Sequence, residues 1–260
     1  MTLTVKSVVA ASNAWQWTLD DMTTVEDAQY KIARLPDYFD PPLTVMEFRP
    51  SGPLGAAVSA VLDRARAFGL PKLRWEVRLD SPAELVAELT ARGATRQLVL
   101  DVLACDLRNG APTLPPASAD VQIRWAAGFE TARDASALRV TGFGGSLPPD
   151  DRIEANAAKD AATVPAGKGG LLVAYVGGVP SGSGGVTIVD GVARLWGGVV
   201  VPSARGQGIY RAVLEARMSY ALAHGATMAL VKGKVDTSGP ILRRAGFTAY
   251  GQEPLYDIAL

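Results

Sequence analysis

The residues best suited to chemistry lie where a predicted strand meets a predicted helix, in VVVPSARGQGIYRAVL (199–214). Arg205, Gly206, Gln207 and Gly208 come directly before Ile209, the first apolar residue of the helix. A helix start presents N–H groups without partners and a partial positive charge, and glycine lets a ligand approach the backbone. The pattern therefore predicts a turn that binds phosphate or pyrophosphate, with Arg205 adding a charged contact. A tight strand-to-helix connection is the alternative interpretation, because neither a Gly-Lys-Ser/Thr nor a GxGxxG motif is present.

The inventory of cysteine and histidine excludes several other kinds of chemistry. The chain has one cysteine, Cys105, and one histidine, His224, so it can form neither an internal disulfide nor a zinc site of Cys and His ligands. No GxSxG elbow accompanies the histidine, which argues against a Ser-His-Asp triad. We expect Cys105 to be a buried, inert thiol and His224 to lie at the C-terminal end of a helix. We expect no metal.

Composition and charge indicate a globular protein without a strong preference for polyanions. The 260 residues include 26 Lys and Arg and 26 Asp and Glu, so no overall field favours nucleic acid or an anionic membrane. The apolar run near the start is too short for a signal peptide, and no run approaches the length of a membrane span. These features predict a cytoplasmic protein of one large or two small domains, with no nucleic-acid or membrane partner.

A break at residues 108–120, RNGAPTLPPASAD, divides the chain into halves that resemble each other. FRPSGPLGAAVSAVL (48–62) aligns without gaps with VVPSARGQGIYRAVL (200–214), and similar strands and helices follow in both halves. We therefore predict a tandem α/β protein with domains at 1–110 and 121–260 and a linker at 111–120. Each domain is expected to hold a mixed, mostly antiparallel sheet flanked by helices.

The second half shows the fuller set of elements. A strand at 121–125 precedes two helices, around 131–140 and 152–163, and residues 170–202 predict three strands. The turn sequences VGGVP and VDGVA predict that these strands form antiparallel hairpins. The loop at 141–151 between the two helices is either a lid over an acceptor site or a plain connection, and Trp196 is a further residue that could touch a ligand.

The stretch 199–214 resembles the acyl-CoA-binding motif of the GNAT acetyltransferase superfamily. That motif has a strand ending in Val-x-Pro, followed by Arg/Gln-x-x-Gly-x-Gly/Ala at the start of a helix. Val200 to Pro202 match the strand, and Arg205 and Gly208 match the first two motif positions. SGPILRRAGF (238–247) is similar to the closing helix of the family, which ends in a Gly-Phe pair. The resemblance covers the second half and implies the GNAT fold there.

The resemblance implies that acetyl-CoA is bound as a co-substrate, mainly by backbone groups. Three residues of the strand would pair with the pantetheine arm: Gly198, Val199 and Val200. The pyrophosphate would be held by the guanidinium of Arg205 and by the amides of Gly206, Gln207, Gly208, Ile209, Tyr210 and Arg211. The implied activity is acetyl transfer to an amine, by direct attack in a ternary complex, since no nucleophile for a covalent intermediate is evident.

Two departures from the family pattern concern the motif and the catalytic acid. Tyr210 stands where the motif has a small residue, and Leu242 stands where the family often has a tyrosine that protonates the departing thiolate. Much of the rate can still come from positioning and from a backbone N–H that polarises the carbonyl. Weak candidates for acid or base are Tyr250, Tyr256, Asp150 and Glu130, in segments that could border the cleft.

The first half predicts a degenerate copy of the motif. Pro53, Leu54 and Ala56 replace Arg205, Gly206 and Gly208, so we expect no phosphate binding there and a structural or pocket-shaping role. A non-catalytic module that binds or senses acyl-CoA is the main alternative to an enzyme. Tandem relatives act on aminoacyl-tRNA or on thiol-containing amino sugars, and activity on one of these substrates is a third possibility. The neutral net charge argues against a large RNA partner. The sequence leaves the acceptor open, and leaves monomer or homodimer open as well.

Overall fold

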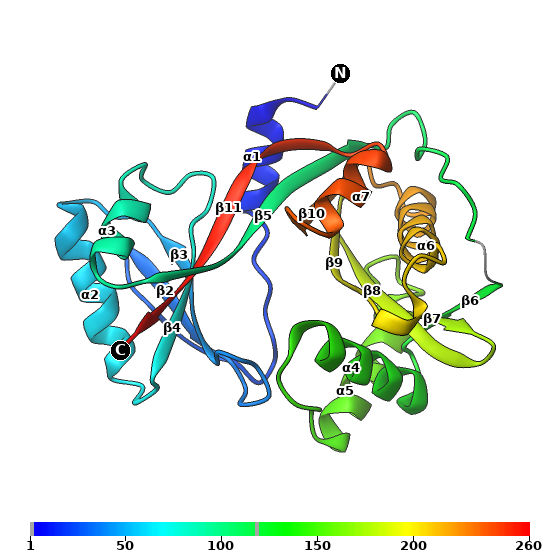
Figure 1. Cartoon of the computed structure of the whole chain (residues 1–260), viewed down its shortest axis with the longest axis horizontal. Helices are drawn as coiled ribbons and strands as arrows, with labels where there is room; N and C mark the ends of the chain where they lie inside the picture. Colours follow the sequence, from blue (N-terminus) through cyan, green and yellow to red (C-terminus); the bar gives the residue numbers. More distant parts are fainter. Residues whose placement is uncertain (1–2, 118–119) are drawn as a thin grey trace. The chain divides into compact units, whose positions relative to one another are not determined.

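The computed structural model describes residues 3–117 and 120–260 (Figure 1). The chain forms two compact units, which do not follow the order of the sequence. The C-terminal unit consists mainly of Leu103–Lys232 and Pro240–Ala249, and the N-terminal unit consists of Val5–Val102, Gly233–Gly239 and Tyr250–Leu260. Two positions of the expected linker, 118 and 119, lie outside the described residues.

The C-terminal unit is built on a mixed sheet. Its strands lie in the order β5-β10-β9-β8-β7-β6. Strands β9 and β10 run parallel, and β6 to β9 pair antiparallel, each with the next. The bounds of the strands are β5 Thr95–Asp106, β6 Val121–Trp125, β7 Gly169–Val176, β8 Val179–Val189, β9 Val192–Val200 and β10 Met228–Lys234. The expected mixed, mostly antiparallel sheet is confirmed for this unit.

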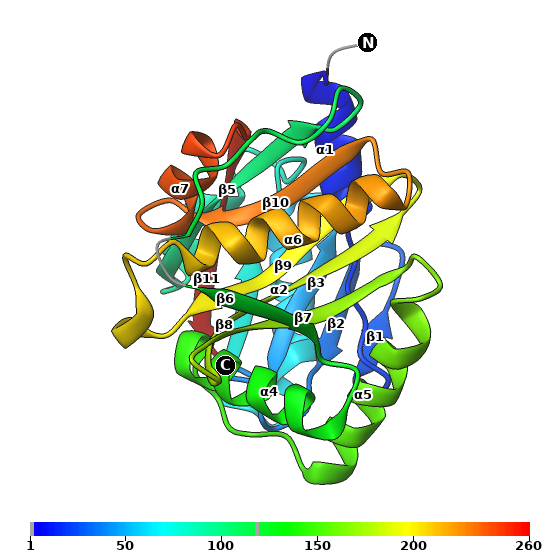
Figure 2. The same ribbon diagram turned by 90° about the vertical axis from the view of Figure 1, so that its right-hand side faces the viewer.

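Helices cover both faces of this sheet, and β7 shows why. Leu172 and Ala174 of β7 pack against α6, whereas Val173 and Tyr175 pack against α4 and α5. Because successive side chains of a strand point to opposite faces, an uninterrupted apolar run such as LLVAY buries both sides of the strand. The helices are α4 Phe129–Phe143, α5 Asp150–Thr163, α6 Ile209–Ala223 and α7 Ser238–Arg244. Figure 2 shows α6 in front of the sheet, beside β9 and β10, and the helix also packs on apolar side chains of β6 and β7.

The two expected hairpins are confirmed, and their turns explain them. Gly177 and Gly178 link β7 to β8 with φ of 56° and 79°, and Asp190 and Gly191 link β8 to β9 with φ of 50° and 73°. Two successive residues with positive φ make a turn whose twist matches that of the flanking strands. The turns thereby fix the register that brings β9 beside β8.

The N-terminal unit has its own sheet, in the order β1-β2-β3-β4-β11-β5. Its core lies between this sheet and two helices, α2 and α3. The elements are α1 Val5–Asn13, β1 Thr23–Glu26, β2 Tyr30–Arg34, β3 Leu43–Phe48, α2 Leu54–Arg66, β4 Lys72–Glu76, α3 Leu85–Ala91 and β11 Thr248–Ala259. None of the described helices is both long and apolar enough to cross a membrane.

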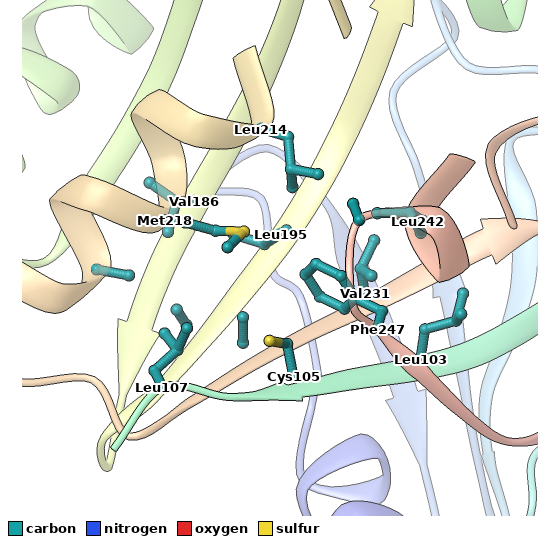
Figure 3. Close-up of a cluster of buried hydrophobic side chains, with 14 of the residues drawn as sticks. Leu103, Cys105, Leu107, Val186, Leu195, Leu214, Met218, Val231, Leu242 and Phe247 are labelled. Atoms are coloured by element: carbon teal, nitrogen blue, oxygen red, sulfur yellow. The ribbon is translucent and has the colours of Figure 1, made fainter. Parts of the chain in front are cut away.

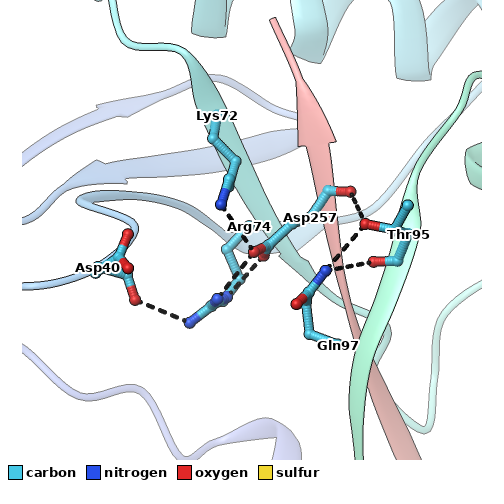
Figure 4. Close-up of polar contacts among 6 residues, drawn as sticks. All are labelled: Asp40, Lys72, Arg74, Thr95, Gln97 and Asp257. Atoms are coloured by element: carbon cyan, nitrogen blue, oxygen red, sulfur yellow. Dashed lines mark hydrogen bonds and ion pairs between the residues drawn. The ribbon is translucent and has the colours of Figure 1, made fainter. Parts of the chain in front are cut away.

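A buried ion pair ties β11 to β4 within the N-terminal unit (Figure 4). Arg74 on β4 binds Asp257 on β11 through two parallel contacts, Nε to Oδ1 at 2.9 Å and Nη2 to Oδ2 at 3.0 Å. Lys72 approaches the same carboxylate at 3.7 Å. Asp257 is only 5% exposed, so the paired geometry offsets the cost of burying its charge.

The last strand of each half of the sequence contributes to both units. Residues 95–102 of β5 belong to the N-terminal unit and residues 103–106 to the C-terminal unit. Most of β11, from Tyr250 onward, belongs to the N-terminal unit, although it follows α7 in the chain. The domain division at 110 and 121 predicted from the sequence stays a prediction about the two related halves of the chain.

Candidate functional site

A β-bulge in β9 marks the centre of the candidate site. Ser183 pairs with Val199 and Gly185 pairs with Trp196, so one residue of β8 faces two residues of β9, Gly197 and Gly198. Gly197 has a φ of 62°, the left-handed conformation that a bulge often requires and that glycine adopts without strain. The parallel pairing of β9 with β10 covers residues 192–195 and stops before the bulge. The backbone of β9 beyond the bulge is therefore suited to pair with an extended ligand.

The turn that follows β9 has the geometry of an anion site. After a short 3-10 helix at Pro202–Ala204, Gly206 and Gly208 both adopt left-handed conformations, with φ of 79° and 81°. Helix α6 begins at Ile209 with no side-chain cap, and the first hydrogen bond of the helix joins the Ala212 N–H to the Gly208 carbonyl. The N–H groups of the first turn have no intrahelical acceptors and lie at the positive end of the helix dipole. This arrangement suits a pyrophosphate group.

The segment before β6 crosses the start of α6. Arg211 donates hydrogen bonds from Nε to the Pro115 carbonyl at 3.1 Å and from Nη2 to the Pro116 carbonyl at 3.2 Å. A β-carbon at Gly208 would lie 2.8 Å from the Cα of Ala117. The side chain of Arg211 is thus bound to this segment, whereas Arg205 is exposed, with Nε 3.4 Å from the Val200 carbonyl. Sequence reasoning gave no sign of this contact.

Tyr210, the departure from the motif, points toward the sheet. A β-carbon at Gly198 would lie 3.1 Å from Cε2 of the tyrosine ring and 3.5 Å from its hydroxyl oxygen. The large residue on the helix is therefore matched by the absence of a side chain on the strand. The ring occupies the α6 face of β9, just beyond the bulge, and is half-buried.

A buried arginine lies two turns further along the same helix. Arg217 is 1% exposed, and a β-carbon at Gly184, the residue of β8 opposite the bulge, would lie 3.0 Å from its Cζ. Its Nε donates to the Val213 carbonyl at 3.2 Å and its Nη1 donates to the Gly185 carbonyl at 3.4 Å. The sequence gave no clear signal for this residue, which falls on the buried face of an amphipathic helix.

The closing helix offers no proton donor at the position expected from the family. Leu242 is fully buried in an apolar cluster with Phe247, Leu103 and Cys105 (Figure 3). Cys105 is 5% exposed, and burial raises the pKa of its thiol, with the charge of Asp106 adding to the effect. The prediction of a buried thiol is confirmed, and Leu242 is a core residue.

The other candidate acids and bases lie in varied surroundings. Asp150 and Glu130 are exposed in the first turns of α5 and α4, where negative side chains favour the helix dipole. Tyr256 is buried in the core of the N-terminal unit, and Tyr250 lies on β11 in that same unit. Each position has an ordinary structural explanation, and a catalytic role for any of the four stays a prediction.

The opposite face of β9 packs against α4. Gly142 lies so close to Val199 that a β-carbon at position 142 would stand 2.2 Å from Val199 Cγ2. Next to this contact, the Ser183 hydroxyl is fully buried and has no hydrogen-bond partner among the described residues. Trp196 lies over Gly185 and donates its Nε1–H to Thr187 Oγ1 at 3.0 Å, which accounts for its orientation.

The loop expected at 141–151 is shorter than predicted. Helix α4 continues to Phe143 and α5 begins at Asp150, so only residues 144–149 are outside the helices. Phe143 is 49% exposed and Leu147 is 47% exposed, which places two large apolar side chains at the surface of this segment. His224 caps the C-terminal end of α6, as predicted.

Comparisons with known proteins agree with this geometry. Residues 137–247 match the model of the acetyltransferase (GNAT) family. A GCN5-related N-acetyltransferase from Kribbella flavida is similar in structure, with 20% identity, a TM-score of 0.64 and coverage of 91% of this chain and 89% of that one. A GCN5-related N-acetyltransferase from Sphaerobacter thermophilus has 17% identity, a TM-score of 0.66 and coverage of 90% and 77%. A tandem GNAT protein from the clavulanic acid biosynthesis pathway has 18% identity, a TM-score of 0.60 and coverage of 96% and 87%.

The segment that matches the GNAT acetyltransferase family is the region that holds the bulge and the glycine turn. The structural similarity extends over most of the chain and concerns the fold. None of the curated proteins matches the sequence. Among the described residues, no group of three His, Cys, Asp or Glu side chains could hold a metal ion.

Proposed function

We propose that the chain is an acetyl-CoA-dependent N-acetyltransferase that transfers the acetyl group to an amine of a small-molecule acceptor. The observation that carries the proposal is the continuous path from the glycine turn, along the backbone of β9 beyond its bulge, to the bulge itself. A pyrophosphate at the first turn of α6 and an extended arm beside β9 would use complementary ends of this path.

Each part of the path has a defined role in this proposal. Gly206 and Gly208 keep the turn free of side chains, so that the amides from Gly206 to Arg211 can reach the phosphate oxygens, and Arg205 adds an exposed positive charge. Gly198, Val199 and Val200 would supply backbone hydrogen bonds to the pantetheine arm. Backbone N–H groups near the bulge would polarise the thioester carbonyl.

The chemistry proposed is direct attack. The amine nitrogen attacks the carbonyl carbon of the thioester, and collapse of the tetrahedral intermediate breaks the C–S bond and releases CoA. Holding the amine against the thioester can supply much of the rate, since positioning alone is worth several kcal/mol of the barrier, about 7–11 in favourable cases. Water can accept the proton that leaves the nitrogen.

The N-terminal half is proposed to lack a second phosphate site. Helix α2 begins at Leu54, which aligns with Gly206, so the residues that match the glycine turn already lie in the helix. Pro53 precedes this helix and has no N–H to donate. Both features support a degenerate copy with a structural or pocket-shaping role.

A non-catalytic module that binds acyl-CoA is the second candidate, and the buried Leu242 favours it. It predicts the same binding without turnover. The distinction therefore needs one measurement of binding and one of chemistry.

Calorimetric titration of acetyl-CoA into the wild type and into Gly208→Glu tests the binding site. The wild type is expected to bind with a Kd in the micromolar range, which corresponds to a binding free energy of about −8 kcal/mol. Gly208→Glu places a negative charge in the turn and is expected to weaken binding at least a hundredfold. Gly225→Glu is the matched control, because Gly225 also has a positive φ of 75°, has open space around it and lies at the far end of α6.

Release of free thiol from acetyl-CoA, measured with a panel of small amines, tests catalysis. Amine-dependent release by the wild type supports the enzyme, and binding without release supports the non-catalytic module. If the wild type does not bind acetyl-CoA, or if Gly208→Glu and Gly225→Glu bind it equally, the proposed site is wrong.

A further inference from the structure

The reaction proposed above leaves a thiolate that must be neutralised, and this inference rests on that proposed function. The closing helix does not supply the proton, because Leu242 fills the expected position and is fully buried. A donor has to come from another element that borders the bulge of β9. Helix α6 provides the tyrosine that lies against it.

Tyr210 is placed by both the helix and the strand. Its ring lies against Gly198, whose missing side chain leaves the room for it, and its hydroxyl would be 3.5 Å from a β-carbon at that position. Gly198 directly follows Gly197, the residue with positive φ in the bulge. The hydroxyl is therefore held beside the point where β9 changes direction.

The length of the path brings the reactive end of the ligand to the same point. Strand residues rise about 3.3 Å each, so an extended arm that follows β9 from Val201 back to Gly198 covers about 10 Å. Such an arm begins next to the glycine turn and ends at the bulge. Its sulfur would then lie on the edge of β9 that Tyr210 overlies.

Arg217 gives this tyrosine a positively charged neighbour. The guanidinium is almost fully buried, its Nη2 has no hydrogen-bond partner, and it forms no ion pair with any carboxylate among the described residues. A buried charge without a counter-charge is costly, which suggests a role that requires it. Burial raises the pKa of the Tyr210 hydroxyl, and the charge of Arg217 opposes that rise.

Among the described residues, the charge that acts on the tyrosine comes from Arg217. From β8, the guanidinium is faced by the Gly185 carbonyl and by Gly184, whose lack of a side chain leaves room for it. The group that faces the tyrosine ring from β9 is Gly198. The electrostatic partner of each side chain is the other one.

We propose that Tyr210 is the catalytic acid that protonates the CoA sulfur, and that Arg217 is a positioning residue that stabilises the resulting phenolate. When the C–S bond breaks, its electron pair passes to sulfur, and the proton of the Tyr210 hydroxyl follows. The phenolate regains a proton from water, and the attacking nitrogen loses one to water. The products are the amide and CoA in its thiol form.

Titration of the thiol of bound CoA tests this without an identified acceptor. Free CoA is bound to the wild type, Tyr210→Phe and Arg217→Met, and the ultraviolet absorption of the thiolate is followed against pH. A hydrogen bond and a nearby positive charge both favour the thiolate, so each variant is expected to raise the thiol pKa by about one unit, a tenfold change in acidity. Tyr210→Phe keeps the ring, and Arg217→Met keeps an apolar chain of similar length, so both are expected to fold.

Tyr220→Phe is the matched control, since it removes a hydroxyl from the same helix, one that donates to the Val164 carbonyl at 2.6 Å. Its bound thiol should titrate like that of the wild type. In the thiol-release assay, Tyr210→Phe should lower kcat by about 10²–10⁴-fold and leave KM nearly unchanged.

Three outcomes would overturn the assignment. If CoA binds but its thiol titrates alike in the wild type and Tyr210→Phe, the tyrosine is not in contact with the sulfur, and the proposed function still stands. If Tyr210→Gly binds CoA at least tenfold more tightly than the wild type, the ring blocks the arm. If CoA does not bind the wild type at all, the proposed function fails and this inference fails with it.

Discussion

The contact between Gly142 and Val199 yields a stability prediction whose size follows from the structure. A β-carbon at position 142 would lie 2.2 Å from Val199 Cγ2 and 3.0 Å from Val199 Cβ, whereas carbon atoms in contact normally stand about 3.5–4.0 Å apart. Gly142→Ala therefore forces α4 and β9 apart by more than about 1 Å. Overpacking costs about 1–3 kcal/mol, and an approach of 2.2 Å belongs to the upper end of that range, about 2–3 kcal/mol, while the helix propensity of alanine returns about 1 kcal/mol. We expect a net loss of about 1–2 kcal/mol of stability.

A double-mutant cycle separates this clash from other effects. Val199→Ala alone should cost about 2 kcal/mol, because Val199 is 8% exposed and packs in the core under α4. In the double variant, the new methyl group at position 142 enters the space that the valine leaves. The two changes should then be non-additive, and the double variant should be about 2 kcal/mol more stable than the sum of the single changes predicts.

Urea unfolding of the four proteins measures the cycle, with Gly52→Ala as a control at a glycine that has no atoms within 4 Å of a β-carbon. The reasoning is refuted if Gly142→Ala is as stable as the wild type, or if the cycle is additive. Because Val199 belongs to the segment proposed to bind the pantetheine arm, Gly142→Ala should also weaken acetyl-CoA binding, and the double variant should recover part of it.

Three further predictions concern other sites. Burial raises the pKa of Asp160 to about 6, although its carboxylate accepts the Leu171 N–H, so the folded protein holds a proton that the unfolded chain releases near pH 4. The stabilisation that this bound proton gives is complete below pH 4 and is lost as the pH rises through 6. Asp160→Asn cannot ionise, so at pH 7 it should be more stable than the wild type by about 2–3 kcal/mol. Paired thermal melts at pH 7 and pH 4 check this, and no such gain is expected at pH 4. Asp257→Asn removes the charge that Arg74 binds and should cost about 2–3 kcal/mol in urea unfolding, and an unchanged midpoint would contradict the ion-pair argument. Cys105 should react with a thiol reagent only after unfolding, and fast modification of the native protein would show that the thiol is accessible.

The local sequence was sufficient for elements whose conformation depends on neighbouring residues. The hairpins were predicted from VGGVP and VDGVA, because glycine and aspartate take the positive φ that such turns need. The start of α6 was predicted because a glycine turn and an apolar repeat occur together. Ser81 shows the limit of such local signals: serine is a favoured helix cap, but Glu84 directly precedes α3, and the Ser81 hydroxyl instead accepts the N–H of Arg78. A side chain that can satisfy either of two turns does not reveal which one the chain adopts.

The sequence by itself determined that this chain carries an α/β unit with a GNAT-type glycine turn, because dihedral preference and helical periodicity are local properties. Only the tertiary structure decided what surrounds that turn. The bulge at Gly197, the fit of Tyr210 against Gly198 and the burial of Arg217 all depend on pairing between β8 and β9 and on the packing of α6. The sharing of β5 and β11 between the two units depends on residues more than a hundred positions apart. Such contacts are set by which surfaces bury one another, and that choice is made by the whole fold and not by any one segment.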